Sequence, residues 1–188
     1  PGPPPLTGEE DMARRLRRLG RSVAMVPEAF DVSWGAEADS PNEMRHWTEM
    51  TGGAAMTEPG IHYLRGSWRL EPGEALVVEG PTVPCRYWNV LLYSRYLNSL
   101  DFRSRSVSRT SGTARLHDGR YRFVIAGEDP GIDADWLDTE GRPFGLVVMR
   151  WLQPSEPVPL PEARVASIEE LQDERPAPSD DLRKDLTP

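Results

Sequence analysis

The dipeptide Asp118-Gly119 is the strongest local structural signal in this chain of 188 residues. An Asp-Gly pair readily adopts the positive φ angles that a two-residue β-hairpin turn requires. After the turn, from Tyr121 to Ile125, a large apolar residue occupies every second position, which is the period of a strand. The sequence therefore predicts strands over residues 113–117 and 120–126, joined by a tight turn.

Four further segments have the pattern of short strands. In residues 61–70, Leu64 and Trp68 belong to an apolar row that alternates with polar residues. The other predicted strands cover 75–80, 87–94 and 143–152. Glycine and proline turns separate the strands, and no helical pattern lies between them. The chain is therefore predicted to be mainly β, an antiparallel β-sandwich or jelly-roll-like domain with an N-terminal amphipathic helix.

The helix is predicted over residues 7–26, where apolar residues are spaced by four, three, four and three positions. They are Met12, Leu16, Leu19, Val23 and Val26. This spacing lays one apolar stripe along a helix, and Pro27 is expected to end it. The favoured interpretation is a stripe that packs on the β-domain; the alternative is a face that binds anions or a membrane surface. An exposed stripe would instead indicate a surface for an oligomer or a partner.

The chain is expected to divide into three parts. Residues 1–60 hold the helix and a connector, partly helical over 42–50; residues 61–171 form the sandwich; residues 172–188 form an acidic, mobile tail. From Ser155 to Pro188 there are nine acidic and four basic residues, so the net charge of −8 is mainly a property of this end. We therefore expect that nucleic acid is not a partner.

The cellular compartment is predicted from features that the sequence lacks. Cys85 is the only cysteine, so the fold needs no disulfide and no oxidising environment. No apolar run reaches the length of a transmembrane helix, and the N-terminus lacks the order of a signal peptide. We expect a cytoplasmic protein without a membrane partner.

Four short motifs follow one another along the chain: Tyr87-Trp88 before a strand, Asp118-Gly119 in a hairpin, Trp136-Leu137, and a closing Arg150-Trp151-Leu152-Gln153-Pro154. In this order, over roughly Tyr63 to Pro154, they resemble the bacterial family known as domain of unknown function 1214. The resemblance implies a jelly-roll-type β-sandwich, often the C-terminal part of a longer protein. It implies no activity, substrate or catalytic residue. Many members have asparagine where this chain has Asp135.

Five carboxylates lie before the last predicted strand: Asp129, Asp133, Asp135, Asp138 and Glu140. Calcium prefers several oxygen ligands from one short segment, but the spacing does not match an EF-hand loop. We therefore expect these residues to cap turns and to pair with Arg142 and other arginines, and we expect neither a metal nor a cofactor. His46, His62 and His117 are scattered, and His62 is interpreted as a core histidine rather than as a ligand.

Three polar residues occupy rows that strand alternation makes otherwise apolar: Glu79, Asn89 and Arg150. A charge on a core-facing row is costly unless it is paired or solvated. One interpretation is a buried Glu79–Arg150 ion pair, with Asn89 bonded to backbone groups. The other is the mouth of a ligand pocket between the sheets, with Trp136 and Arg142 in the loop that covers it. These five residues are the candidate ligand-binding residues.

Two classes of function fit these residues. The first is a β-sandwich module that binds a small ligand, or a protein partner through the N-terminal helix, without catalysis; a homo-oligomer belongs to this class. The second is an enzyme, a hydrolase or isomerase of a small metabolite, with Glu79 or Asp138 as base and Arg142 or Arg150 as anion clamp. The sequence contains no recognisable nucleophile–base or metal-binding motif, which favours the first class.

Overall fold

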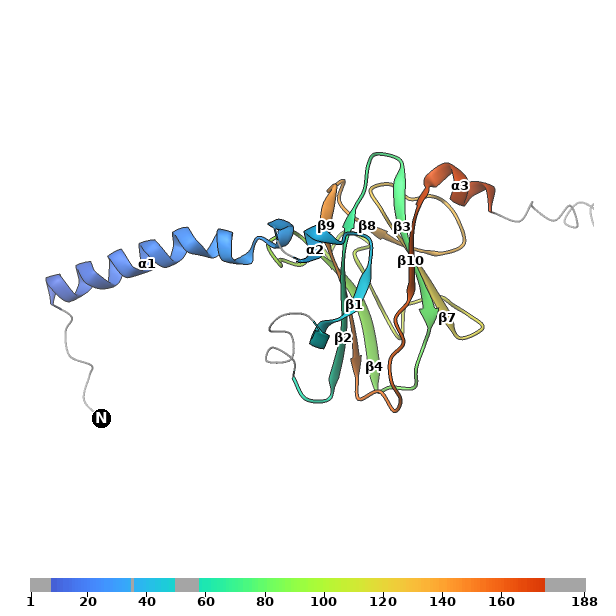
Figure 1. Ribbon diagram of the computed structural model, residues 1–188, viewed down its shortest axis with the longest axis horizontal. Helices are drawn as coiled ribbons and strands as arrows, with labels where there is room; N and C mark the ends of the chain where they lie inside the picture. The colour runs from blue at the N-terminus through green and yellow to red at the C-terminus, as the bar shows by residue number, and fades with distance from the viewer. Residues whose placement is uncertain (1–7, 35, 50–57, 175–188) are drawn as a thin grey trace, which may run out of the picture.

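Two five-stranded β-sheets packed face to face form the body of the protein, and one long helix extends from it (Figure 1). The computed structural model describes residues 8–34, 36–49 and 58–174. The predicted fold class, a mainly-β sandwich with an N-terminal helix, is confirmed.

The first sheet is antiparallel throughout, with β9 at its centre. In spatial order its strands are β1 (Met44–His46), β2 (Ile61–Arg69), β9 (Phe144–Leu152), β4 (Tyr87–Tyr93) and β5 (Ser108–Thr110). The Cα partners across the three middle strands place Tyr63, Arg150 and Asn89 in one row. Side chains of directly opposed residues lie on the same face of a sheet, so these three neighbours share one face.

The second sheet contains the predicted hairpin. Its strands are β10 (Glu162–Ser167), β3 (Glu74–Pro81), β7 (Arg120–Ala126) and β6 (Leu116–His117) in that order, with β8 (Asp135–Asp138) also paired to β7. All pairs are antiparallel except β7–β8, which is parallel. Asp118 and Gly119 join β6 to β7 with positive φ angles of 51° and 73°. The hairpin that the dipeptide predicts is therefore confirmed.

One hydrophobic core fills the space between the sheets. Its fully buried rings include Trp68 and Trp151 from the first sheet and Phe123 from the second. The ring of Tyr121 stacks on that of Phe123, with centroids 5.0 Å apart. Aromatic side chains bury more apolar area than other residues, so these rings contribute a large part of the free energy of folding.

A second hydrophobic cluster covers the outer face of the second sheet. The short helix α3 (Ile168–Asp173) contributes Leu171, which is buried in one cluster with Val77 of β3. A capping box fixes the start of α3, because the Ser167 hydroxyl accepts from the Glu170 N–H and the Glu170 carboxylate accepts from the Ser167 N–H. Strand β3 is therefore buried on both faces.

The predicted strand boundaries agree with the long strands and miss the short ones. β2, β3, β4, β7 and β9 each begin and end within one residue of the prediction, whereas the strand predicted over 113–117 shrinks to β6. The connector predicted to be partly helical over 42–50 contains the 3-10 helix η2 (Trp47–Glu49), and also β1, which joins the first sheet and which the prediction missed. β5, β8 and β10 are short and contain charged residues, so they lack a strand pattern. Residues 175–188 of the predicted tail lie outside the described residues.

Helix α1 (Glu9–Phe30) extends away from the sandwich instead of packing on it (Figure 1). The helix continues past Pro27 to Phe30, so the prediction that this proline ends it is wrong. Leu16 and Leu19 of the stripe are 59% and 58% exposed. The expectation that the stripe packs on the β-domain is therefore wrong. No helix in the described part of the chain combines the length and apolar character needed to cross a membrane.

After α1, three short elements lead into the first sheet. They are the 3-10 helix η1 (Val32–Trp34), helix α2 (Ala36–Asp39) and β1. Arg95, in the turn after β4, pairs with Asp31, and this hydrogen bond lowers the pKa of the Asp31 carboxyl. The ion pair anchors the end of α1 to the sandwich.

Candidate functional site

The three polar residues predicted on core-facing rows lie on the outer faces of the two sheets. On β3, Leu76 and Val78 belong to the core between the sheets, so Glu79 is on the opposite face. Asn89 and Arg150 are on the outer face of the other sheet, with the whole core between them and Glu79. The predicted Glu79–Arg150 ion pair is therefore wrong. Both faces of these strands are apolar, so alternation alone does not identify the core-facing row.

Glu79 belongs to an ion-pair network on the second sheet. Its carboxylate lies 3.1 Å from Arg122, its Cα partner on β7. Arg122 and Arg164 in turn bind Glu174 at 2.6 and 2.8 Å. The hydrogen bond from Arg122 lowers the pKa of Glu174, and the bond from Arg164 adds to this effect. The network joins β3, β7 and β10 to the residue that follows α3, which is a structural role.

A hollow of about 220 Å³ lies beside Arg150 on the outer face of the first sheet. The residues that line it come from three strands, from η2 and from the turn after β4: Trp47, Tyr63, Arg65, Tyr93, Leu97, Val148 and Arg150. Arg150 is the only one of the five predicted site residues in this lining. We call this feature the Arg150 hollow.

Two tyrosines hold the Arg150 guanidinium in place. Its central carbon lies 5.4 Å from the ring centroid of Tyr63 and 5.6 Å from that of Tyr93. Its Nη2 donates to the Tyr93 hydroxyl at 2.7 Å. Each cation–π contact contributes about 0.5–2 kcal/mol, depending on how far the pair is removed from water. None of the carboxylates that the structure describes pairs with Arg150, so its charge is oriented by the protein but not neutralised by it.

Arg65 forms a second cationic wall of the Arg150 hollow. Its guanidinium carbon lies 4.6 Å from the centroid of a Trp47 ring. Trp47 follows β1 directly, and β1 pairs with β2, so backbone pairing brings the indole over Arg65. Val148 is the Cα partner of Arg65 on β9 and lines the space between the two arginines. The hollow therefore combines cationic groups with aromatic and aliphatic walls.

Asn89 lies beside the hollow with an unsatisfied oxygen. It is the Cα partner of Arg150 on the side opposite Tyr63. Its Oδ1 atom is buried and accepts no hydrogen bond from the part of the chain that the structure describes. A buried acceptor without a donor costs about 1–3 kcal/mol. The row that carries Arg150 therefore holds a second polar group whose interactions are incomplete.

His46 and His62 form an imidazole pair where β1 meets β2. Nδ1 of His46 lies 3.0 Å from Nε2 of His62, and the His62 ring contacts Trp151 edge to face. Burial lowers the pKa of His62, and the nearby His46 lowers it further. His62 is thus a hydrogen-bonded histidine at the margin of the core, in line with its interpretation from sequence. Among the described residues no three potential ligand side chains gather in a way that could hold a metal ion.

Trp136 and Arg142 lie away from the Arg150 hollow. Trp136 is in β8, beside the second sheet, and its indole N–H donates to the Ala126 carbonyl at 3.1 Å. Arg142 follows β8 and pairs with Glu140 at 3.0 Å. Neither residue lines the hollow, so the loop predicted to cover the site does not do so.

The acidic segment forms ion pairs with arginines, as predicted. Asp138 lies 2.7 Å from Arg105, and Asp135 lies 2.9 Å from Arg109. Asp135 also accepts from the backbone N–H of Arg115 at 2.7 Å. These contacts join β8 to the segment between β4 and β6. They also occupy carboxylates that a metal cation would need as ligands.

Sequence reasoning nominated Arg150 but missed the residues around it. Tyr63 and Arg65 stand in the polar row of β2, and Tyr93 stands in the same row of β4 as Asn89. The signal that could have found them is the register of β2 and β4 on β9, which a single sequence does not contain. Trp47 lies in the connector and carries no periodic signal at all.

Comparison with known proteins supports the fold and names no activity. No family model and no curated protein matches the chain. A crystal structure of an uncharacterized protein from Burkholderia cenocepacia is similar, with a TM-score of 0.66 and 30% identity over 72% of this chain and 38% of that one. A structure of a Vibrio parahaemolyticus protein matches 89% of this chain and 48% of that one, with 20% identity and a TM-score of 0.43. The chain thus spans less than half the length of either protein.

We predict that Asp135 is needed for stability rather than for binding. Its side chain is 3% exposed, so Asp135→Ala leaves the Arg109 charge without its carboxylate partner and the Arg115 N–H without its acceptor. The expected loss in the free energy of unfolding is on the order of 3–5 kcal/mol, measured by urea denaturation. The control is Asp133→Ala, whose side chain is 75% exposed and which should cost about 1 kcal/mol or less. Equal losses in the two variants would contradict this assignment.

Proposed function

We propose that this domain is a non-catalytic binding module and that the Arg150 hollow is its small-molecule site. One observation carries the proposal: a half-buried guanidinium is held between two tyrosine rings and has no carboxylate partner among the described residues. A protein that needed Arg150 only for folding would gain by pairing or replacing its charge. Convergent polar groups among apolar walls are typical of ligand sites.

The composition of the lining favours binding over catalysis. The residues around the hollow are arginine, aromatic or aliphatic, so this lining offers no carboxylate, imidazole or thiol as a general base. The carboxylates of the alternative enzyme hypothesis are engaged elsewhere. Glu79 pairs with Arg122 on the other sheet, and Asp138 is buried against Arg105. Neither proposed base therefore lies at the Arg150 clamp.

We also propose that the chain belongs to the family it resembles, domain of unknown function 1214, and that the protein is cytoplasmic. The β-sandwich architecture is the fold that this resemblance implies. The single cysteine, Cys85, is half-buried, and burial raises the pKa of its thiol. Cys85 therefore resembles a small apolar residue rather than a reactive thiol, which agrees with a fold that needs no disulfide.

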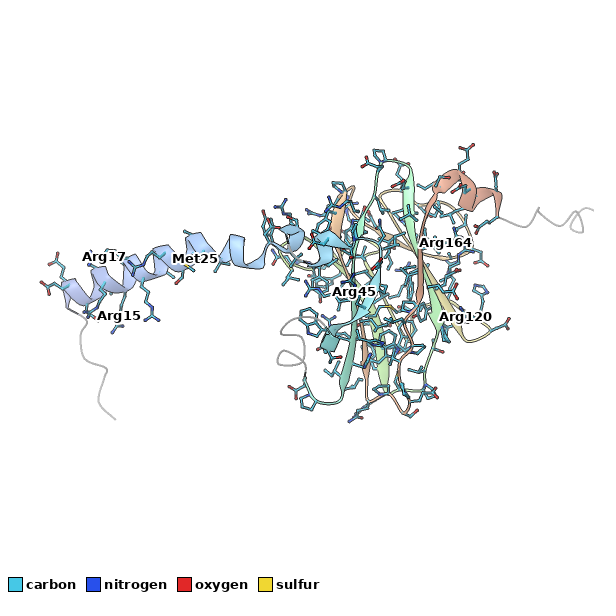
Figure 2. All side chains as sticks on the ribbon, in the orientation of Figure 1. Arg15, Arg17, Met25, Arg45, Arg120 and Arg164 are labelled. Carbon is cyan, nitrogen blue, oxygen red and sulfur yellow. The ribbon has the colours of Figure 1, made fainter. Side chains whose placement is uncertain are left out.

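Co-purification tests the binding function. We predict that the full chain, purified under gentle conditions and analysed by native mass spectrometry, carries a small molecule that is lost on denaturation. Arg150→Met should remove this molecule, because it removes the unpaired charge while keeping an unbranched side chain. Arg120→Met is the matched control: Arg120 is exposed on the second sheet, at the hairpin (Figure 2), and the change should leave occupancy unaltered. A molecule that stays bound to Arg150→Met would contradict the assignment of the site.

The exposed stripe of α1 supports a second function, self-association. Its five members, from Met12 to Val26, are between 46% and 62% exposed. A single helix is marginally stable in water and gains most of its stability from packing of its apolar face. The spacing of four, three, four and three is that of a seam between two helices, narrower than the face of a helix that packs on a sheet. We infer that the occupant of the stripe is α1 of a second copy.

An antiparallel pair buries four of the five members of the stripe and leaves Val26 opposite Glu9 at each end. With Leu16 of one copy opposite Leu19 of the other, Met12 falls opposite Val23, so the pair forms four apolar layers. Small residues, Ala13 and Gly20, flank the stripe on one side and allow the two backbones to approach closely. The antiparallel order also separates the acidic first turns, which a parallel pair would bring together.

Oligomeric state tests this inference. We predict that light scattering on the full chain shows a dimer that dissociates on dilution. The combined change Leu16→Glu and Leu19→Glu should give a monomer, because it buries four charges in the proposed seam. Met25→Glu is the control, since Met25 is 65% exposed on the same helix (Figure 2) but lies outside the stripe. A monomeric native chain, or a dimer that persists in the double variant, would contradict the pairing.

A further inference from the structure

We propose that the ligand of the Arg150 hollow is a small monocarboxylate with a planar, apolar body. In this arrangement the carboxylate binds the Arg150 guanidinium and the Tyr93 hydroxyl, and the body lies among the rings and aliphatic side chains of the hollow. The inference rests on the proposed binding function and extends it to a chemical class.

The positive charge of Arg150 favours an anionic ligand. Arg150 is half-buried, donates one N–H to Tyr93 and contacts two ring faces, none of which carries a full negative charge. A guanidinium has five N–H donors, so several remain for a ligand. A carboxylate that reaches this group forms charge-assisted hydrogen bonds, and partial burial strengthens them relative to water.

Tyr93 provides the second donor. Its hydroxyl oxygen accepts from Arg150 Nη2 at 2.7 Å, which leaves its own hydrogen for another acceptor. Guanidinium and phenol therefore present donors side by side, which suits the two oxygens of one carboxylate. Tyr93 acts here both as a ligand contact and as the group that orients Arg150.

The backbone around the hollow disfavours a phosphate. Phosphate sites are usually built from free backbone N–H groups at helix starts or in glycine-rich loops. Here β9 is paired on both sides, with β2 and with β4, so its N–H groups belong to the sheet ladders. The second cation, Arg65, is 9% exposed and stacks against Trp47, which restricts its movement towards a dianion. A single negative charge fits this donor set better than two.

The walls of the hollow select the body of the ligand. Trp47 and Tyr63 offer ring faces, and Leu97 and Val148 offer aliphatic surface. Flat apolar groups stack on such faces and lose little conformational entropy on binding. A volume of about 220 Å³ lies below the range that is usual for drug-sized ligands, so the hollow encloses a group of compact size.

Titration with matched probes tests the ligand class. Benzoate, benzamide and phenyl phosphate share one ring and differ in the charge and shape of the attached group. The readout is the NMR signal of the Trp47 indole N–H in the full chain, assigned by its loss in Trp47→Phe. We expect saturable shifts with benzoate and binding of benzamide that is weaker by about tenfold or more, since a hydrogen bond to a charged group is at stake. Phenyl phosphate should bind more weakly than benzoate.

Variants locate the effect at the proposed atoms. Arg150→Met should abolish the benzoate shift, and Arg120→Met should leave it unchanged. Tyr93→Phe keeps the ring and removes the hydroxyl, so it should weaken benzoate several-fold while affecting benzamide less. This difference separates a role in anion binding from a general effect on the shape of the hollow.

Any other outcome contradicts either the proposed ligand class or the proposed binding function. Equal binding of benzoate and benzamide would refute the carboxylate class and leave a ligand site in place. Tighter binding of phenyl phosphate than of benzoate would replace the carboxylate by a phosphate. A Trp47 signal that none of the probes shifts would overturn the ligand class, and a protein that also co-purifies with no molecule would overturn the binding function itself.

Discussion

The register of β9 between β2 and β4 is the constraint on which both the core and the hollow depend. β9 pairs with β2 from Phe144 to Leu152 and with β4 over most of the same length. This register sends Met149 and Trp151 into the core and Arg150 to the outer face. A slip by one residue would exchange these sets and place a guanidinium among buried rings. The stability of the core therefore also fixes the position of the Arg150 charge.

The paired strands of this sheet fix the positions of the residues around the hollow. Tyr63, Tyr93 and Arg150 are on paired strands, so their ring and guanidinium positions follow from backbone hydrogen bonds. Sites built on strands hold their groups more accurately than sites built on loops. Several other charged groups of the sandwich form ion pairs, as in Asp135–Arg109 and Glu79–Arg122. Arg150 differs from these because it is oriented by two tyrosines and has no carboxylate partner in the described part of the chain.

The sequence predicted the elements of the fold better than the faces of its strands. Alternation located β2, β7 and β9, since a period of two is a local property, and Asp118-Gly119 located the hairpin. Inner and outer faces could not be told apart, because α3 covers β3 from outside and the outer face of β4 carries Leu91 between Asn89 and Tyr93. Arg150 was therefore recognised as unusual but given a partner, Glu79, on the wrong side of the core. The residues around Arg150 come together only through the pairing of strands that are far apart in the sequence. The apolar stripe of α1 identified the helix but not its packing, since the same spacing fits a helix on a sheet and a helix paired with another helix.

We propose that Arg150 is kept for a ligand and not for the fold. The most direct measurement is the free energy of unfolding of Arg150→Met against the native chain, from urea denaturation without added ligand. Arg150→Met loses the contacts with the two tyrosines but ends the cost of holding a charge partly away from water, and no described carboxylate loses its partner. Stability should therefore fall by no more than about 2 kcal/mol, or rise. A loss of about 3–5 kcal/mol, the cost of breaking a buried ion pair, would show that Arg150 has a structural partner and would contradict the account.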